Sequence, residues 1–357
     1  MKALITAGGH ATRLRPVTQT INKHLIPIAN KPMIFYALEK VAEIGIKEVG
    51  IIINPGDENF QKAVGNGEKF DVKITYIEQK GGPLGLGHVI KMSQGFLGDE
   101  PFLFYLGDNI LLNSLAHLKK SFEEKKANCL LALSRVNDPQ RFGVPDIQNG
   151  KIVKVDEKPE KPKSDFAVTG VYFYDSSIFK AVENLKPSAR GELEISDAHT
   201  YLIDHGYKVE YEEITGWWKD TGKPQDLLEA NQLVLAALSK SSRRGEIEAG
   251  VTIQGPVDIG AGTKIMGRNT IIRGPVIIGG NCYVENSYIG PYTTVGDKVE
   301  IYNSEIENSI VLEFTDINCG KRIVDSLIGK NCQITSASKT FPNGHKLVIG
   351  DQSLIEL

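Results

Sequence analysis

The sequence is poor in cysteine and contains no long apolar run. Its four cysteines, Cys129, Cys282, Cys319 and Cys332, show no CxxC or other metal-ligand spacing, which argues against a zinc site. They are most simply explained as buried thiols in a reducing cytosol. No run reaches the roughly 18 apolar residues of a membrane helix, so no membrane partner is expected. The chain also enters a strand-like run at once, without a charged and apolar leader. This predicts a cytoplasmic protein without a signal peptide.

An excess of one charge is lacking too. The chain of 357 residues has 41 Lys and Arg against 44 Asp and Glu, which gives a net charge of −3. This balance gives no reason to expect a nucleic-acid partner, and cations that bind phosphate must act locally. The length allows two domains with a substantial hydrophobic core, and 41% hydrophobic residues is ordinary for a globular protein.

Two common nucleotide-binding motifs, GxxxxGK[ST] and GxGxxG, are absent from the N-terminal region. Instead, the apolar run from Ala3 to Ala7 stops at Gly8-Gly9, which is typical of a buried strand followed by a tight loop. Ligands bind at such strand ends in open α/β sheets, and glycines let backbone N–H groups approach an anion. Arg13, Arg15 and Lys23 follow, and three cations suit a polyphosphate. The stretch predicts a nucleoside triphosphate site, with a purely structural turn as the alternative.

Up to about residue 235, apolar strand-like runs alternate with amphipathic helical stretches. Phe102 to Leu106 is a very apolar run, and Met33 to Ile44 has helical spacing. The alternation predicts βαβ units, and therefore an α/β fold with a doubly wound, Rossmann-like, mostly parallel sheet. Pro224 to Leu238 is expected to form a connecting helix, because Pro224 suits a first helical turn.

Helical periodicity is missing after about residue 250, where an aliphatic residue recurs every six positions. The series resumes after phase slips and often has glycine after the aliphatic residue. Its members are Ile253, Ile259, Ile265, Ile271, Ile277, Ile289, Val295, Ile301, Ile317, Ile323, Ile328 and Ile334. This repeat predicts a left-handed parallel β-helix, whereas a β-sandwich would alternate with period two. We therefore expect a catalytic domain over residues 1–238, a linker over 239–249 and a β-helix domain over 250–357.

The N-terminal string GG-x-A-T-R-L-x-P, followed by K-x-L-x-P and N-K-P-M, resembles the signature of the sugar-1-phosphate nucleotidylyltransferases. Ala11 stands where that family usually has Gly, a small-for-small change. The resemblance covers essentially the whole chain and is greatest to long-form members that use dTTP and glucose 1-phosphate. It implies transfer of a deoxythymidylyl group to glucose 1-phosphate, giving dTDP-glucose and pyrophosphate by a single in-line displacement at the α-phosphate. The ending Lys346 to Asp351 after a β-helix is part of this resemblance.

Three alternatives remain open. The substrates could be UTP, or a broad range of nucleotides, with glucose or N-acetylglucosamine 1-phosphate. The β-helix could add acyl transfer, a chemistry that usually needs a histidine base, and only His345 is available there. The chain could also be a non-catalytic regulatory subunit on the same fold. Exposed flat coils favour self-association, so a homo-oligomer is expected.

The expected chemistry needs charge neutralisation rather than a base, because a phosphate oxygen is already the nucleophile. A hard divalent cation on one or two carboxylates meets this need. Asp108 follows the very apolar run, and Asp220 lies in Trp218-Lys219-Asp220-Thr221-Gly222. Both match the metal-binding aspartates of the family, which implies Mg²⁺ as cofactor; a capped turn is the alternative for Asp108.

The resemblance also implies the substrate contacts. Arg13 and Lys23 would steady the triphosphate on the loop formed by Ala7, Gly8 and Gly9. Lys158 would hold the sugar phosphate, and counts with Arg13, Lys23 and Asp108 as catalytic, although composition alone favours a solvated loop there. The sugar and its phosphate would be bound by Asn109, Gly143, Glu157, Lys158, Gly170, Tyr172, Arg190 and Trp218.

The base is expected at the loop from Gln79 to Gly87. The Gln79 amide can donate to and accept from a pyrimidine edge, and Gly85 would let the base lie flat on the backbone. The family pattern Q-x-x-P-x-G-L-A aligns with Gln79, Pro83 and Gly85. This chain has one residue more between the glutamine and the proline, and Gly87 instead of Ala.

Overall fold

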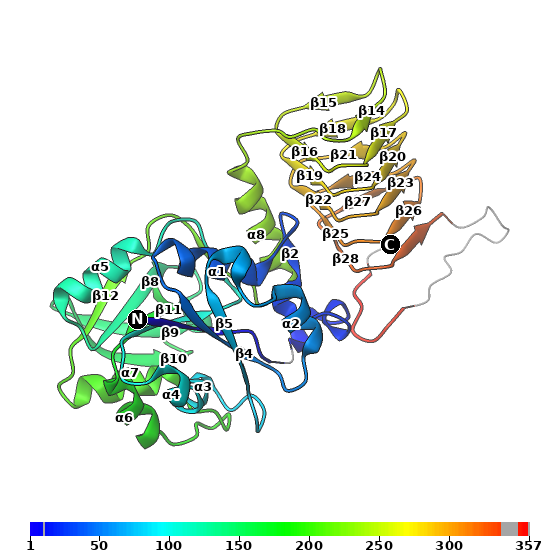
Figure 1. Cartoon of the computed structure of the whole chain (residues 1–357). Helices are drawn as coiled ribbons and strands as arrows, with labels where there is room; N and C mark the ends of the chain where they lie inside the picture. Colours follow the sequence, from blue (N-terminus) through cyan, green and yellow to red (C-terminus); the bar gives the residue numbers. More distant parts are fainter. Residues whose placement is uncertain (10, 337–348, 356–357) are drawn as a thin grey trace. The chain divides into compact units, whose positions relative to one another are not determined.

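The computed structural model describes residues 1–9, 11–336 and 349–355. They form two compact units (Figure 1). The first contains residues 1–10 and 33–220, and the second contains residues 11–32 and 221–357. His345 and the first part of the stretch from Lys346 to Asp351 lie outside the described residues.

The first unit is built on a nine-stranded mixed sheet. Its main path runs β10-β9-β11-β6-β1-β4-β5, and β8 pairs with both β11 and β12. The strands are β1 (Lys2–Thr6), β4 (Glu48–Ile53), β5 (Lys73–Glu78), β6 (Phe102–Leu106), β8 (Cys129–Arg135), β9 (Gly143–Gln148), β10 (Lys151–Glu157), β11 (Phe166–Tyr174) and β12 (Val209–Glu213). The strands β5, β4, β1 and β6 are parallel, whereas β11 is antiparallel to β6 and to β8.

Near-continuous apolar sequence explains why the central strands form. In β4 only Glu48 is exposed, and β6 is buried along most of its length. Parallel strands that are covered on both faces have such runs instead of an alternating pattern. The expected parallel α/β domain is therefore confirmed, and β6 has the predicted bounds.

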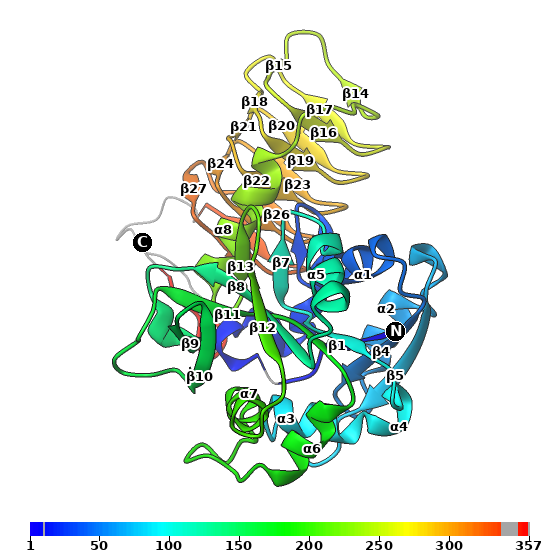
Figure 2. The same cartoon turned by 90° about the vertical axis from the view of Figure 1, so that its left-hand side faces the viewer.

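Helices cover both faces of this sheet. The helices are α1 (Met33–Glu43), α2 (Glu58–Val64), α3 (Leu86–Met92), α4 (Gln94–Leu97), α5 (Ala116–Lys125), α6 (Ser177–Asn184) and α7 (Ile195–Asp204). Figure 2 shows α3, α6 and α7 together on one side of the strands, and α1 and α5 on the other. A short antiparallel pair, β7 (Asn109–Leu111) with β13 (Trp218–Asp220), follows the end of β6.

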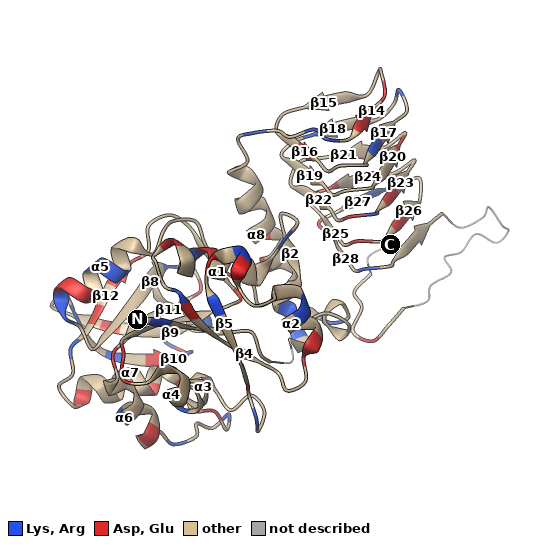
Figure 3. Cartoon of the chain, in the orientation of Figure 1, with Lys and Arg blue, Asp and Glu red and all other residues tan. Residues whose placement is uncertain are grey.

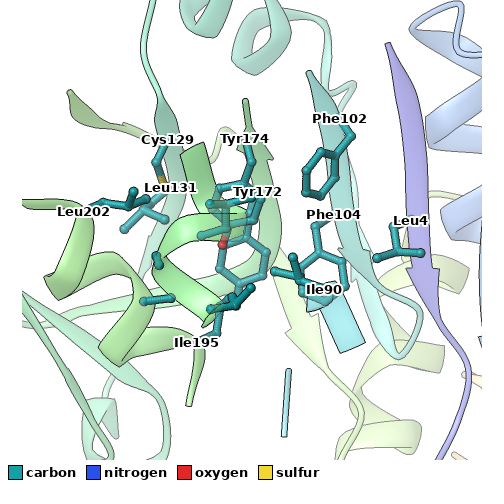
Figure 4. Close-up of a cluster of buried hydrophobic side chains, with 14 of the residues drawn as sticks. Leu4, Ile90, Phe102, Phe104, Cys129, Leu131, Tyr172, Tyr174, Ile195 and Leu202 are labelled. Carbon is teal, nitrogen blue, oxygen red and sulfur yellow. The ribbon is translucent and has the colours of Figure 1, made fainter. Parts of the chain in front are cut away.

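The core beneath α3, α6 and α7 is rich in aromatic rings from β6 and β11 (Figure 4). Phe104 stacks on Tyr172 with ring centroids 5.7 Å apart, and Phe102 lies 5.6 Å from Tyr174. Each such buried side chain contributes about 1.5–3 kcal/mol of hydrophobic stabilisation. This packing fixes β11 beside β6 and thereby the side chains at the ends of both strands.

The second unit contains a β-helix made of three stacked parallel sheets, as expected. The first sheet has β14 (Glu246–Ile247), β17 (Lys264–Met266), β20 (Tyr283–Glu285), β23 (Glu300–Tyr302), β26 (Asp316–Asn318) and β29 (Gln333–Thr335). The second has β15 (Thr252–Gln254), β18 (Ile271–Arg273), β21 (Tyr288–Ile289), β24 (Glu305–Glu307) and β27 (Arg322–Val324). The third has β16 (Val257–Ile259), β19 (Val276–Ile278), β22 (Thr293–Val295), β25 (Ile310–Val311) and β28 (Leu327–Ile328).

Stacked aliphatic side chains fill the interior of the β-helix. The six-residue phase of the inward positions shifts by one residue before Ile271, earlier than the sequence pattern predicts. Ile272 and Ile278 are buried, while Ile271 and Ile277 are only partly covered. The extra residue lies in the turn after Met266, and it moves the inward position of β18 by one. The strand β14 lies within residues 239–249, the stretch expected to be a linker.

The second unit also includes α8 (Pro224–Ala236), the predicted connecting helix, and the N-terminal segment 11–32. This segment has short 3-10 helices at Thr12–Leu14, Val17–Gln19 and Lys23–Leu25, and a hairpin of β2 (Pro27–Ile28) and β3 (Lys31–Pro32).

Two simple expectations can be checked on the described residues. No helix among them is both long and apolar enough to cross a membrane. All four cysteines are unpaired; Cys129 and Cys282 are buried, whereas Cys319 and Cys332 are only partly covered. Figure 3 shows basic and acidic residues interspersed along the described elements of each unit, in line with the small net charge.

A buried histidine makes the stability of the first unit depend on pH. His199 on α7 is fully buried, and its Nε2 lies 2.6 Å from the Tyr174 hydroxyl. Burial lowers the pKa of His199 from 6.5 to about 3, so the folded chain keeps it neutral. The unfolded chain binds a proton as the pH falls below about 6.5, and stability is therefore lost from there down towards pH 3.

We predict that this loss disappears in His199→Phe. Between pH 6 and 5 the free energy of unfolding of the native sequence should fall by about 1 kcal/mol more than that of the variant. Urea unfolding at several pH values measures both slopes. Equal slopes would show that His199 is already protonated in the folded protein.

Candidate active site

The carboxyl ends of four parallel strands place the first group of candidate residues at one edge of the sheet. Thr6 pairs with Leu106 across β1 and β6, so the loops that begin at Ala7 and Gly107 leave the sheet side by side. Asn54 follows β4 and Gln79 follows β5 at the same edge. This edge is where open α/β sheets bind their ligands.

The glycine loop is held by two side chains from neighbouring strand ends. Asn54 accepts a hydrogen bond from the Gly9 N–H at 2.9 Å and donates to the Gly9 carbonyl at 3.1 Å. A Cβ placed on Gly8 would lie 3.2 Å from the Gln79 Oε1, so the amide expected to read the base packs directly on the loop. Ala7 is fully buried beneath them. The role of Asn54 was not predicted, because Asn54-Pro55-Gly56 has the composition of an ordinary turn.

Asp108 and Asp220, the predicted metal ligands, are brought together. Asp220 on β13 pairs with Asn109 on β7, the residue next to Asp108. Asn109 is 2% exposed, and its Nδ2 donates to the Asp108 Oδ1 at 2.8 Å while its Oδ1 accepts from the Trp218 Nε1 at 2.6 Å. One buried amide therefore fixes the orientation of the Asp108 carboxylate and of the Trp218 ring.

Two residues of β11 interact with this arrangement, Gly170 with Asn109 and Tyr172 with the charges of the two aspartates. Gly170 gives the space that Asn109 needs, because a Cβ there would lie 2.7 Å from the Asn109 Nδ2. Burial raises the pKa of Tyr172, and the negative charges of Glu157, Asp108 and Asp220 raise it further. Tyr172 therefore keeps its proton and remains a hydrogen-bond donor close to the carboxylates.

Glu157 and Lys158, the predicted sugar-phosphate residues, lie together at the end of β10. The Ser196 hydroxyl donates to the Glu157 Oε2 at 2.7 Å, and the Lys158 ammonium lies 3.2 Å from its Oε1. A Cβ on Gly143, the first residue of β9, would lie 2.9 Å from the Ser196 Oγ, so glycine leaves room for Ser196 beside Glu157. Lys158 has φ of 45°, a left-handed backbone that costs a non-glycine residue of order 1 kcal/mol and is common at functional sites.

Arg190 joins this cluster through two carboxylates. Its guanidinium donates to Glu194 at 2.8 and 3.2 Å and lies 3.4 Å from the Glu157 Oε1. Burial lowers the pKa of Arg190, but the bonds and charges of Glu194, Glu192 and Glu157 outweigh this and raise it overall. Glu194 is 7% exposed and also accepts from the Ser188 hydroxyl at 2.6 Å. Two cations, Lys158 and Arg190, thus flank one glutamate, an arrangement that suits a phosphate group with neighbouring hydroxyls.

The base loop and the loop that carries Arg190 are joined through their backbones. The Leu193 N–H donates to the Leu84 carbonyl at 2.8 Å, and the Gly87 N–H donates to the Leu193 carbonyl at 2.9 Å. A Cβ on Gly85 would lie 2.6 Å from the Leu193 carbonyl, and φ of Gly85 is 94°. A Cβ on Gly87 would lie 2.9 Å from the same oxygen and 2.8 Å from the Leu185 side chain. The contact with Leu193 explains why both positions are glycine here. Pro83 lies exposed in the same loop.

The two predicted triphosphate cations, Arg13 and Lys23, belong to the second unit. Each lies in a short 3-10 helix, and the Asn22 side chain caps the helix of Lys23 by accepting from the His24 N–H at 2.9 Å. Ala11 has φ of 45°, a backbone conformation that suits the glycine expected there from the family signature and that costs an alanine of order 1 kcal/mol.

The donor set of the first unit fits magnesium. Among the described residues, no cluster of three or more His, Cys, Asp or Glu could bind a metal alone. Mg²⁺ usually retains several waters and is bound by one or two carboxylates together with substrate phosphates. The pair Asp108 and Asp220 offers hard oxygen ligands of that kind, and no sulfur or imidazole ligand that zinc would prefer accompanies it among the described residues.

Comparison with known proteins agrees with this geometry. The model of the nucleotidyl transferase family matches residues 2–237. A glucose-1-phosphate thymidylyltransferase of Streptomyces antibioticus is 44% identical over 100% of this chain and 99% of its own length. The low-salt glycan biosynthesis nucleotidyltransferase Agl11 of Haloferax volcanii is 42% identical over 100% of both chains. A solved structure of a glucose-1-phosphate thymidylyltransferase from Bacillus anthracis is 39% identical with a TM-score of 0.61, covering 65% of this chain and 94% of that one.

The chain therefore belongs to the nucleotidyl transferase family, and within it to the sugar-1-phosphate nucleotidyltransferases. The full-length match to the Streptomyces protein includes the β-helix as well as the sheet unit.

We predict that Gly87→Ala weakens the backbone contact between the base loop and Leu193. The added methyl group meets a backbone oxygen, so the free energy of unfolding should fall by about 1–3 kcal/mol, and the KM for the nucleotide should rise. The matched control is Gly95→Ala in α4, where a Cβ meets no atom within 4 Å and alanine should stabilise the helix by up to about 1 kcal/mol. Chemical denaturation of both variants is the measurement, and equal stabilities would contradict the close contact.

Proposed function

We propose that this protein transfers a deoxythymidylyl group from dTTP to glucose 1-phosphate, giving dTDP-glucose and pyrophosphate. The observation that carries the proposal is the pairing of Asp220 with Asn109 beside Asp108, in the same unit as the two cations Lys158 and Arg190 that flank Glu157. Such a site can neutralise phosphates through its two cations and through a divalent ion on its carboxylates. This is the requirement of a displacement in which the substrate phosphate attacks.

In this reaction an oxygen of the sugar phosphate attacks the α-phosphorus of dTTP. A new phosphorus–oxygen bond forms, and the bond to the β-phosphate oxygen breaks, so that pyrophosphate leaves with the electron pair. Lys158 and Arg190 hold the attacking phosphate, and Arg13 and Lys23 steady the triphosphate on the loop of Gly8 and Gly9. When Mg²⁺ is bound at Asp108 and Asp220, it offsets phosphate charge.

Recognition of the two substrates is assigned to different loops. Gln79, packed on Gly8, is proposed to read the pyrimidine edge, with Pro83 and Gly85 beside the base. The sugar is proposed to be surrounded by Asn109, Gly143, Glu157, Gly170, Tyr172 and Trp218.

We assign the chemistry to residues 1–238, with 239–249 as the connecting segment and 250–357 as the β-helix domain. The reaction uses cytoplasmic metabolites, so we propose the cytoplasm as its location.

We predict that pyrophosphate release with Mg²⁺ and glucose 1-phosphate is fastest with dTTP among dTTP, UTP, ATP, GTP and CTP. Asp108→Asn should lower this rate about 100-fold or more, because the variant loses a charged ligand of the cation. Asp99→Asn, at an exposed carboxylate, is the control and should retain the rate. Turnover with UTP that equals or exceeds turnover with dTTP would favour the uridylyl or broad-specificity alternative.

The name of the Haloferax relative specifies neither nucleotide nor sugar, which is why the panel should include N-acetylglucosamine 1-phosphate. Absence of pyrophosphate release with all these pairs would favour the non-catalytic alternative.

We also propose that the protein is a homo-oligomer. The β-helix exposes large apolar side chains, with Phe314 48% and Val324 46% exposed. Sedimentation velocity at several concentrations should give a mass above that of the 39.2 kDa chain. A monomer at all concentrations would contradict this.

A further inference from the structure

The N-terminal segment with the two triphosphate cations packs against the β-helix rather than only against its own neighbours in sequence. The segment 11–32 and residues 221–357 form one compact unit. The segment ends in the hairpin of β2 and β3, whose turn residues Ala29 and Asn30 have φ of 49° and 58°. Two successive residues with positive φ define a tight two-residue turn, which fixes the shape of the hairpin tip.

One buried amide connects this tip to the β-helix. Asn231 on α8 is 1% exposed. Its Oδ1 accepts from the Ala29 N–H at 2.8 Å and lies 3.4 Å from the Thr294 hydroxyl, while its Nδ2 donates to the Tyr292 carbonyl at 3.0 Å. The Asn231 side chain therefore uses both its donor and its acceptor, and it contacts the hairpin and the β-helix at once.

A second amide makes the same connection from the other side. The Asn30 Nδ2 donates to the Val295 carbonyl of β22 at 2.6 Å. The hairpin tip is thus bound to one coil of the β-helix by two side chains, one from α8 and one from the tip itself. A buried amide such as Asn231 is costly to leave unpaired, so the tip has one favoured position on the coil.

The position of the tip bears on the cation Lys23. Only Ile26 and β2 separate the short helix of Lys23 from the turn, and Ile26 and Ile28 are fully buried. A stiff, buried connection of this length transmits a displacement of the tip to the lysine.

We propose that the β-helix is a positioning device for the triphosphate-binding segment, and that Asn231 and Asn30 are the positioning residues. The inference assigns a role to the β-helix and rests on the proposed function. The two residues act through Lys23 on the nucleotide, so their effect should be on the nucleotide and not on the sugar phosphate.

The test measures initial rates of pyrophosphate release by the full chain, with dTTP and glucose 1-phosphate varied separately. Asn231→Asp removes the donor to Tyr292, and Asn30→Gly removes the bond to Val295 while tolerating the positive φ. Each variant should raise the KM for dTTP about 3–10-fold, with the KM for glucose 1-phosphate within about twofold of the native value. The two changes combined should raise it by less than the product of the single effects, since both residues hold one tip.

The matched control is Gln232→Ala. Gln232 lies next to Asn231 on α8 and bonds to Asn308 of the β-helix at 2.7 Å, without a contact to the hairpin in that bond. It should leave both KM values unchanged. The inference is overturned if the Asn231 and Asn30 variants change both KM values equally, change neither, or match Gln232→Ala.

The native chain in the same assay separates the two proposals. Inactivity with every nucleotide overturns the proposed function and this inference together, whereas an active native chain with unaffected variants overturns the inference alone. If Asn231→Asp does not fold, Asn30→Gly alone decides the outcome.

Discussion

The parallel pairing of β1 with β6 is the constraint on which the candidate site depends. It makes two loops leave the sheet at one edge, one with the glycines and one with Asp108. The fit is close, because a Cβ at Gly107 would collide with the Thr6 carbonyl, to which the Gly107 N–H donates. Asn109 then starts β7, whose pairing with β13 brings in Asp220. The two carboxylates, 112 positions apart in sequence, meet because these strands pair one after the other.

The charged side chains around Glu157 are paired with neighbours of opposite sign. Glu157 lies between Lys158 and Arg190, and Glu194 holds the far side of the Arg190 guanidinium. These ion pairs are partly exposed, so each adds little to stability. Their value lies in geometry: two cations are held within reach of one carboxylate before any substrate arrives, and less side-chain entropy is then lost on binding.

Much of this architecture could be predicted from periodicity and short motifs. The unbroken apolar run of β6 reflects burial on both faces of the sheet, whereas the helical spacing of α1 and the six-residue repeat each reflect one face that must be buried. The slip at Ile272 could not be predicted, because adjacent isoleucines at 271 and 272 are chemically equal and only the turn length decides between them.

The sequence also could not predict site residues whose hydrogen-bond partners lie far away in the chain. Asn54 and Ser196 have the composition of a turn and of a helix start, and their partners Gly9 and Glu157 are far away in sequence. The contact of Gly87 with Leu193 left one trace in the sequence, the departure from the Ala expected there from the family pattern. That trace indicated a difference but not its cause.

The placement of segment 11–32 has a consequence for the order of synthesis. Asn30 bonds to the Val295 carbonyl, a contact that spans 265 positions. At roughly 5–20 residues per second, the hairpin tip waits on the order of 10–50 s for its partner coil to be made. During that time the strand before the segment can join its sheet, but the segment itself has no β-helix to bind. A nascent chain therefore carries Arg13 and Lys23, the cations proposed to bind the triphosphate, on an unanchored segment until translation is nearly complete, and this part of the proposed site forms last.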